Sequence, residues 1–175
     1  MDKLNVFSSK DIAKITQHRS GEIKFGEKII TVPSDENWIS FITQSEAKFV
    51  LIGLPEDIGI KANLGRTGAA SAFESTLKSL VNFQHNKFCK GDELLVLGEI
   101  NFSVEMEISK TLDTQNKEDR KKLFQLVENI DKDLISSSSN SWWGRRSGQE
   151  GLYFREFSHY LFAWLGQKLW HSARR

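Results

Sequence analysis

The residues best suited to bind or transform a ligand lie in the stretch GLPEDIGIKANLGRTGAASAFE, residues 53 to 74. Arg66 could hold a carboxylate through two parallel hydrogen bonds, and Asn63 lies three residues before it. Four of the twelve glycines, Gly53, Gly59, Gly65 and Gly68, fall in the same stretch. Glycine permits positive φ and close backbone approach, so the stretch is either a shaped loop with a function or a plain connection.

A phosphate-binding loop is the first interpretation to weigh. That motif needs four residues between its glycines and then Lys followed by Ser or Thr. Here five residues separate Gly59 from Gly65, and Arg66 and Thr67 follow. The spacing argues against nucleotide binding. Two interpretations remain open: a connecting loop, or the rim of a site at the carboxyl end of a parallel strand, where ligands of α/β proteins bind.

The other chemically active side chains do not form a recognisable set. His18 and His85 are expected in surface or loop positions, and His159 and His171 have no carboxylate at ligand spacing. We therefore expect no metal ligand among the histidines. Cys89 is the one cysteine, and we expect it to be a buried, inert thiol rather than a reactive one. Asp131-Lys132-Asp133 falls in a helical pattern, where residues two apart point in different directions.

Composition bounds the class of protein. The chain has 175 residues, 39% of them hydrophobic and 27% charged, with a net charge of +1. This favours one globular domain and gives no reason to expect nucleic acid as a partner. A lone cysteine excludes a disulfide framework. No apolar run is long enough for a membrane span, and we expect no secretory signal. A cytoplasmic location is the resulting expectation.

Periodicity predicts the elements that must position the loop. Residues 48–54 and 92–100 are short apolar runs typical of buried strands, the second closed by Gly98. Residues 69–83 and 117–134 carry apolar side chains at helical spacing. A further helix is expected after a cap at Ser34 or Asp35, and a hairpin turning at Gly26 within residues 22–32. Strand, helix, strand, helix in series predicts an α/β fold with a parallel sheet.

The composition changes abruptly at about residue 135, so we divide the chain into residues 1–134 and 135–175. The second part begins with a serine run, holds four of the five tryptophans, and ends in an aromatic stretch of helical spacing. Three interpretations stay open: the product of a shifted reading frame or truncated gene, a replacement helix that caps the sheet, and an aromatic-basic surface for a partner or membrane interface. We favour the first.

The loop and its preceding strand resemble the ureohydrolase (arginase) superfamily. The pattern is an apolar strand, then Gly-x-Pro-x-Asp-x-Gly, then Asn-x-Gly-Arg-x-Gly-Ala. The matching residues are Gly53, Pro55, Asp57, Gly59, Asn63, Gly65, Arg66, Gly68 and Ala69. This form is most similar to the formimidoylglutamase branch, and residues 82–103 resemble its continuation into the second strand. The resemblance covers about residues 1–134. The Pro and Arg that many members carry in the next helix are not matched; Phe73 and Lys78 lie near those positions.

The resemblance implies a three-layer α/β/α fold and manganese-dependent hydrolysis of N-formimino-L-glutamate to glutamate and formamide, a step of histidine degradation. It implies substrate binding by Asn63 and Arg66 near the site mouth. The alternative, which we favour slightly, is that Arg66 only stabilises the loop. The remaining matched residues, Gly53, Pro55, Asp57, Gly59, Gly65 and Gly68, would shape the loop. Family members are commonly oligomers, so homo- or hetero-oligomers are expected.

The manganese-ligand motifs of the family, Gly-Gly-Gly-His, Asp-Ala-His-x-Asp and Asp-x-Asp at strand ends, do not occur after residue 100. We therefore expect a truncated α/β domain that binds no manganese and is inactive as this chain, with poor solubility from its open sheet edges. The alternative is a non-catalytic interaction module that docks on a partner through its aromatic C-terminal helix.

Overall fold

The computed structural model of the protein describes residues 3–141. Its centre is a three-stranded sheet in the order β1-β3-β2, formed by β1 (Leu4–Val6), β2 (Phe49–Gly53) and β3 (Leu94–Ile100). β2 runs parallel to β3, whereas β1 is antiparallel to it. The α/β class is confirmed, as are both predicted strands. The prediction of a wholly parallel sheet is wrong, because the N-terminal residues add an antiparallel strand whose signal is only three residues long.

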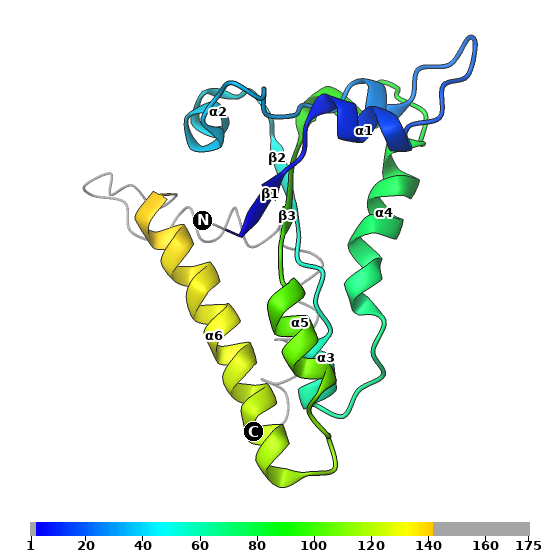
Figure 1. Ribbon diagram of the computed structural model, residues 1–175. Coiled ribbons are helices and arrows are strands. Elements are labelled where there is room, and N and C mark those ends of the chain that lie inside the picture. The colour runs from blue at the N-terminus through cyan, green and yellow to red at the C-terminus, as the bar shows by residue number, and fades with distance from the viewer. Residues whose placement is uncertain (1–2, 142–175) are drawn as a thin grey trace.

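Helices cover both faces of the sheet (Figure 1). They are α1 (Ser9–Ile15), α2 (Trp38–Gln44), α3 (Ile58–Ala62), α4 (Ala72–Val81), α5 (Ser103–Lys110) and α6 (Lys117–Ser141). Short 3-10 helices occupy Phe25–Glu27, Ala69–Ser71 and Gly91–Glu93. No helix in the described part of the chain combines the length and hydrophobicity that crossing a bilayer requires.

Central strand β3 organises the core, since its side chains alternate between the two faces. Leu95 and Leu97 are fully buried in a cluster with residues of α2, and Val96 is fully buried in a second cluster with α1 and α4. A third cluster lies past the end of the strand, where α3, α5 and α6 pack together around Ile58 and Leu123. The sheet is therefore buried on both faces.

The sequence suggested that Gly98 ends the second strand, but β3 continues through Gly98 to Ile100. Leu51 pairs with Val96 and Ile52 with Gly98, so Leu97 is an extra residue in a β-bulge. Gly98 has φ +136°, and a Cβ added to it would lie 2.0 Å from the backbone oxygen of Asn5. Glycine is needed at this position because the backbone of the neighbouring strand β1 lies too close to leave room for a side chain.

The predicted hairpin at Gly26 is wrong. Gly26 lies in the 3-10 helix Phe25–Glu27, where a Cβ would lie 2.3 Å from the Thr16 hydroxyl oxygen and 2.8 Å from Val81 Cβ. Close packing against α1 and α4, rather than a reverse turn, explains this glycine. The following chain forms a parallel bridge between Ile30 and Leu95 of β3.

Two helix boundaries also differ from expectation. The cap of α2 is Asn37 rather than Ser34 or Asp35: its side-chain oxygen accepts hydrogen bonds from the backbone N–H groups of Ile39 and Ser40 at 3.0 and 3.3 Å. The polar connection before residue 117 contains the unpredicted helix α5, in which the exposed Val104 and Ile108 are interspersed with Glu105 and Glu107, so the apolar pattern is too short to predict a helix.

The two long predicted helices are confirmed. Within residues 69–83, Leu77 and Val81 of α4 are buried, but Ala69 lies in a 3-10 turn and is exposed. The apolar stripe of α6, which runs from Leu123 through Ile130 to Leu134, faces α3 and α5. Helix α6 continues past the expected division at residue 134 as far as Ser141. The proposed aromatic helix beyond it lies outside the described residues.

Candidate functional site

The stretch from Gly53 to Ala72 is an ordered connection from β2 to α4 with a short helix, α3, built into it. Its entry depends on Gly53: a Cβ there would lie 2.3 Å from the Phe73 ring. Phe73 lies over the end of β2 and contacts Phe7, with ring centroids 6.3 Å apart. The aromatic ring of α4 thus takes the space that a side chain at position 53 would need.

Both ends of α3 are capped locally. The Glu56 carboxylate accepts hydrogen bonds from the N–H groups of Ile58 and Gly59 at 2.5 and 3.0 Å. At the other end, the N–H of Leu64 bonds to Lys61 O and that of Gly65 to Ile60 O. This is a Schellman motif, which usually places glycine at the left-handed position. Here that position is Leu64, with φ 59°.

Asp57 clamps the far end of the loop to its beginning. Its carboxylate accepts hydrogen bonds from the N–H of Gly68 at 3.1 Å and from that of Ala70 at 3.0 Å. These amides open the turn that leads into α4, where a negative charge is favoured. Gly68 has φ +142°, which only glycine adopts readily. Asp57, Gly65 and Gly68 therefore shape the loop; at Gly65 a Cβ would lie 2.8 Å from Ile60 Cγ2.

The two residues expected to bind substrate are exposed. The Asn63 side-chain amide donates a hydrogen bond to Gly59 O at 2.8 Å, so it supports the end of α3. Arg66 makes no hydrogen bond or ion pair with the residues the structure describes, which leaves its guanidinium available to an anion. Asn63 and Arg66 share a loop, but neither lines the pocket that follows.

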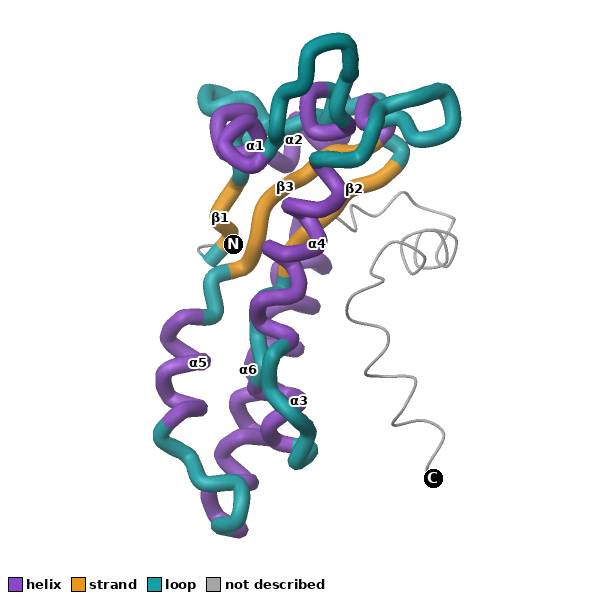
Figure 2. Tube along the Cα trace, turned by 90° about the vertical axis from the view of Figure 1, so that its right-hand side faces the viewer, coloured by secondary structure: helices purple, strands orange, loops and turns teal. Residues whose placement is uncertain are grey.

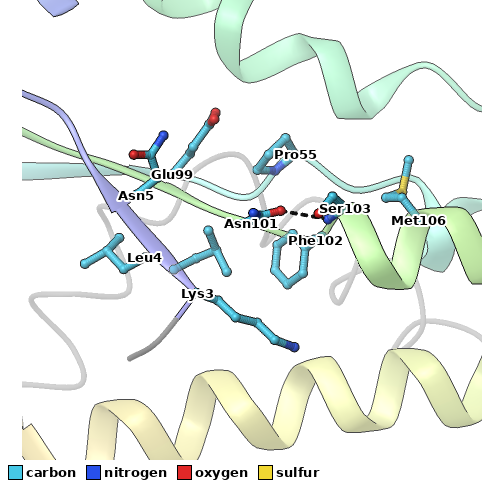
Figure 3. A pocket seen from close by; sticks show the side chains of 10 residues that line it. Lys3, Leu4, Asn5, Pro55, Glu99, Asn101, Phe102, Ser103 and Met106 are labelled. Carbon is cyan, nitrogen blue, oxygen red and sulfur yellow. Dashed lines mark hydrogen bonds between the residues drawn. The ribbon is translucent and has the colours of Figure 1, made fainter.

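A hollow of about 550 Å³ opens at the carboxyl ends of β2 and β3 (Figure 3). Its wall combines apolar side chains with amide, hydroxyl and charged groups. The lining residues are Lys3, Leu4, Asn5, Pro55, Glu99, Ile100, Asn101, Phe102, Ser103 and Met106. Pro55 is the one residue of the sequence-predicted set in this lining. The position agrees with the expectation that a site lies beyond the carboxyl ends of parallel strands.

Glu99 is a titratable group of this hollow whose pKa is altered by its environment. It pairs in register with Asn5 of β1 and with Gly53 of β2, and its side chain lies beside Asn5 on the side facing α4 (Figure 3). Burial, reinforced by the negative charge of Glu74, raises the pKa of the Glu99 carboxyl above 4.5, and a hydrogen bond with Asn5 opposes this. Such a carboxyl is a candidate acid or base.

Lys3 extends to the opposite side, toward α6 (Figure 3). Its ammonium group contacts the Glu105 carboxylate at 2.5 Å and Asp133 at 3.4 Å, so it joins β1 to α5 and α6. The hydrogen bond to Glu105 raises the Lys3 pKa. Sequence reasoning missed both Lys3 and Glu99, because only the antiparallel pairing of β1 brings residues 3–5 to this edge of the sheet.

The remaining candidate side chains do not lie together in one site. His18 is exposed and lies 3.6 Å from Glu27, while His85 accepts a hydrogen bond at Nδ1 from Gly91 N–H within its own turn. Cys89 is half-buried rather than buried, contrary to expectation. Among the described residues, no three His, Cys, Asp or Glu side chains converge as metal ligands would. The donor set of this part of the chain does not fit a pair of manganese ions.

Comparison of the chain with protein-family models, with curated proteins and with solved structures finds no match in any of the three.

Proposed function

We propose that residues 1–134 are the N-terminal part of a ureohydrolase-type domain of the formimidoylglutamase kind, whose substrate is N-formimino-L-glutamate. The observation that carries the proposal is the geometry of the β2–α4 connection. The residues that make the resemblance are those the connection needs: Gly53 beneath Phe73, Asp57 on two amides, and Gly68 at φ +142°. A matched residue that has a geometric reason in this chain is more informative than a matched letter alone.

The metal chemistry of that family finds no support in the described residues, because their carboxylates and imidazoles do not converge. No catalytic step is therefore assigned to this chain. What it offers is a binding contribution: Arg66, exposed on an ordered loop, for a substrate carboxylate.

The experiment is ligand-observed NMR of the full chain with N-formimino-L-glutamate, in parallel with an assay for formamide release in added manganese. We expect weak saturable binding, no turnover, and loss of binding in Arg66→Ala. The control is Arg19→Ala, which removes another exposed arginine, 3.9 Å from Glu22 and far from this loop in the sequence. Equal binding by Arg66→Ala and wild type would refute the role of Arg66. Release of formamide in the presence of manganese would refute the expectation that this chain is inactive.

The origin of residues 135–175 is tested separately, by sequencing the coding DNA from codon 130 onward and translating all three frames. We expect Gly-Gly-Gly-His and Asp-Ala-His-x-Asp to appear in another frame. Their absence from every frame would favour the alternative function.

That alternative is a non-catalytic interaction module. It is favoured by the apolar face of α5, where Val104 and Ile108 lie one helical turn apart and are 66% and 44% exposed. A partner that co-purifies with the full chain and is lost on deletion of residues 140–175 would support it. A partner retained after that deletion would show that the tail is not the docking element.

A further inference from the structure

Two segments from distant parts of the sequence meet at the end of the molecule away from α3 and α5, where loops project beyond the sheet (Figure 2). One segment follows α1 and leads to Phe25; the other joins α4 to β3. Hydrogen bonds from Phe25 N–H to Phe83 O at 2.7 Å and from His85 N–H to Ile23 O at 2.8 Å link them. This end belongs neither to the hollow at Glu99 nor to the loop at Arg66.

The tip of the second segment is a tight turn that displays Phe88. The Asn86 side-chain oxygen accepts hydrogen bonds from Phe88 N–H at 2.9 Å and Cys89 N–H at 3.1 Å, and Asn86 N–H donates to Cys89 O at 3.0 Å. These bonds hold the turn in one conformation. Phe88 is nevertheless 87% exposed, more than any other large hydrophobic residue described.

Apolar and basic groups accompany Phe88 at this end. Phe83 and Ile23 are 55% and 47% exposed. The Lys87 ammonium lies 4.8 Å from the Phe88 ring centroid, and Lys28 lies against Gly91 at the base of the turn. Both lysines are exposed, and neither forms an ion pair within the described part of the chain. Lys90 is compensated by Glu93, 3.6 Å away.

We propose that this end, the Phe88 tip, is a docking surface for an anionic lipid membrane. An aromatic side chain on a preformed turn can enter the acyl boundary without a further ordering cost, while lysines beside it reach the negative headgroups. A protruding aromatic side chain with one cation beside it and another at the base of its turn suits a planar, deformable lipid surface better than a folded protein, which would have to supply a matching pocket. The chemistry that recognises the tip is therefore the phosphate and carboxylate headgroups of an anionic lipid.

The expected affinity of the Phe88 tip for an anionic lipid surface is modest. Lysine near an anionic surface contributes about 1 kcal/mol, or about a fivefold change in affinity. Removing the phenyl group of Phe88 is expected to weaken binding about tenfold. One aromatic residue and two free lysines give weak, reversible association that weakens with added salt.

The test is co-sedimentation of the full chain with large vesicles of phosphatidylcholine alone and of phosphatidylcholine mixed with phosphatidylserine. We expect binding to the mixed vesicles only, about tenfold weaker for Phe88→Ala and at least fivefold weaker for Lys87→Glu. The control is Phe124→Ala, which removes a 41% exposed phenyl group from α6 and should bind as wild type does. Since Phe88 is exposed, its replacement should leave the circular dichroism spectrum unchanged.

Failure of the wild-type chain to bind mixed vesicles would overturn the proposal, as would equal binding by Phe88→Ala. Equal loss in Phe124→Ala would also overturn it, because the tip would then have no special role. Binding to poly-L-glutamate that depends on Phe88, without binding to vesicles, would assign the tip to an acidic protein instead.

Discussion

Replacement of Gly98 by alanine is the sharpest test of the fold that positions the candidate site. Gly98 lies in the β-bulge of the central strand, with φ +136° and the backbone of the neighbouring strand β1 close beside it. Alanine there meets two separate penalties. The first is a backbone conformation that residues with a side chain rarely adopt, which costs about 1–3 kcal/mol.

The second penalty is steric. The new Cβ would lie 2.0 Å from Asn5 O, whereas carbon and oxygen approach to about 3.3 Å. Strand β1 would have to move by about 1.3 Å, and hydrogen bonds such as Phe7 N–H to Leu97 O, now 3.0 Å, would exceed bonding distance. Loss of two such bonds adds about 2 kcal/mol. The total, about 3–5 kcal/mol, is a large part of the stability of an ordinary domain.

Gly68→Ala is the matched control. Gly68 has nearly the same φ, +142°, but nothing lies within 4 Å of the Cβ it would gain. Urea unfolding followed by circular dichroism should therefore show Gly98→Ala about 2 kcal/mol less stable than Gly68→Ala. Equal losses in the two variants would refute the close approach of β1 to the bulge, and with it the assignment of Lys3 and Asn5 to the hollow.

Three further changes test the loop and the hollow. Asp57→Ala should lower the free energy of unfolding by about 1–2 kcal/mol, measured by urea unfolding, because two backbone N–H groups lose their acceptor; an unchanged value would remove the clamp. Leu64→Gly should raise that free energy by about 0.5–1 kcal/mol, because glycine relieves the left-handed strain at φ 59° and Leu64 is mostly exposed; destabilisation would contradict the Schellman assignment. The raised pKa of Glu99 means that the folded protein binds this proton more tightly than the unfolded chain, so stability should rise as the pH falls through the folded pKa toward 4.5. In thermal melts from pH 7 to 4 the wild type should therefore gain stability relative to Glu99→Gln as the pH falls, and parallel curves would mean that Glu99 is not partly desolvated in the folded protein.

The sequence predicted the elements whose signal is long and periodic. The stripe from Leu123 to Leu134 and the apolar runs at 48–54 and 92–100 identified α6, β2 and β3, because burial of a whole face demands a repeated pattern. It failed where a contact between distant residues decided the structure. Gly26 was interpreted as a turn, yet its glycine is required by Thr16 and Val81. No local pattern contains that information.

The same limit applies to the candidate site. The spacing of the β2–α4 connection was recognisable, because Gly53, Asp57 and Gly68 each answer a constraint within about twenty residues of one another. The hollow at Glu99 was not, because it is assembled by β1, which reaches β3 from the far end of the sequence and pairs with it over only three residues. Loop-shaping residues could be found by pattern, and pocket-lining residues could not.

The contrast between loop-shaping and pocket-lining residues determines how the proposed function can be tested. The resemblance rests mostly on residues that shape a loop, and Arg66 is the one matched side chain whose charged group is exposed and without a partner in the described residues. If the geometry of the loop served packing alone, Arg66→Ala would leave ligand binding, loop and stability unchanged. If the loop serves a carboxylate-bearing substrate, the same substitution should abolish binding with no change in unfolding free energy, since an exposed, unpaired arginine adds little to stability. Binding and stability measured on the same variant therefore separate a loop with a ligand from a loop that only connects β2 to α4.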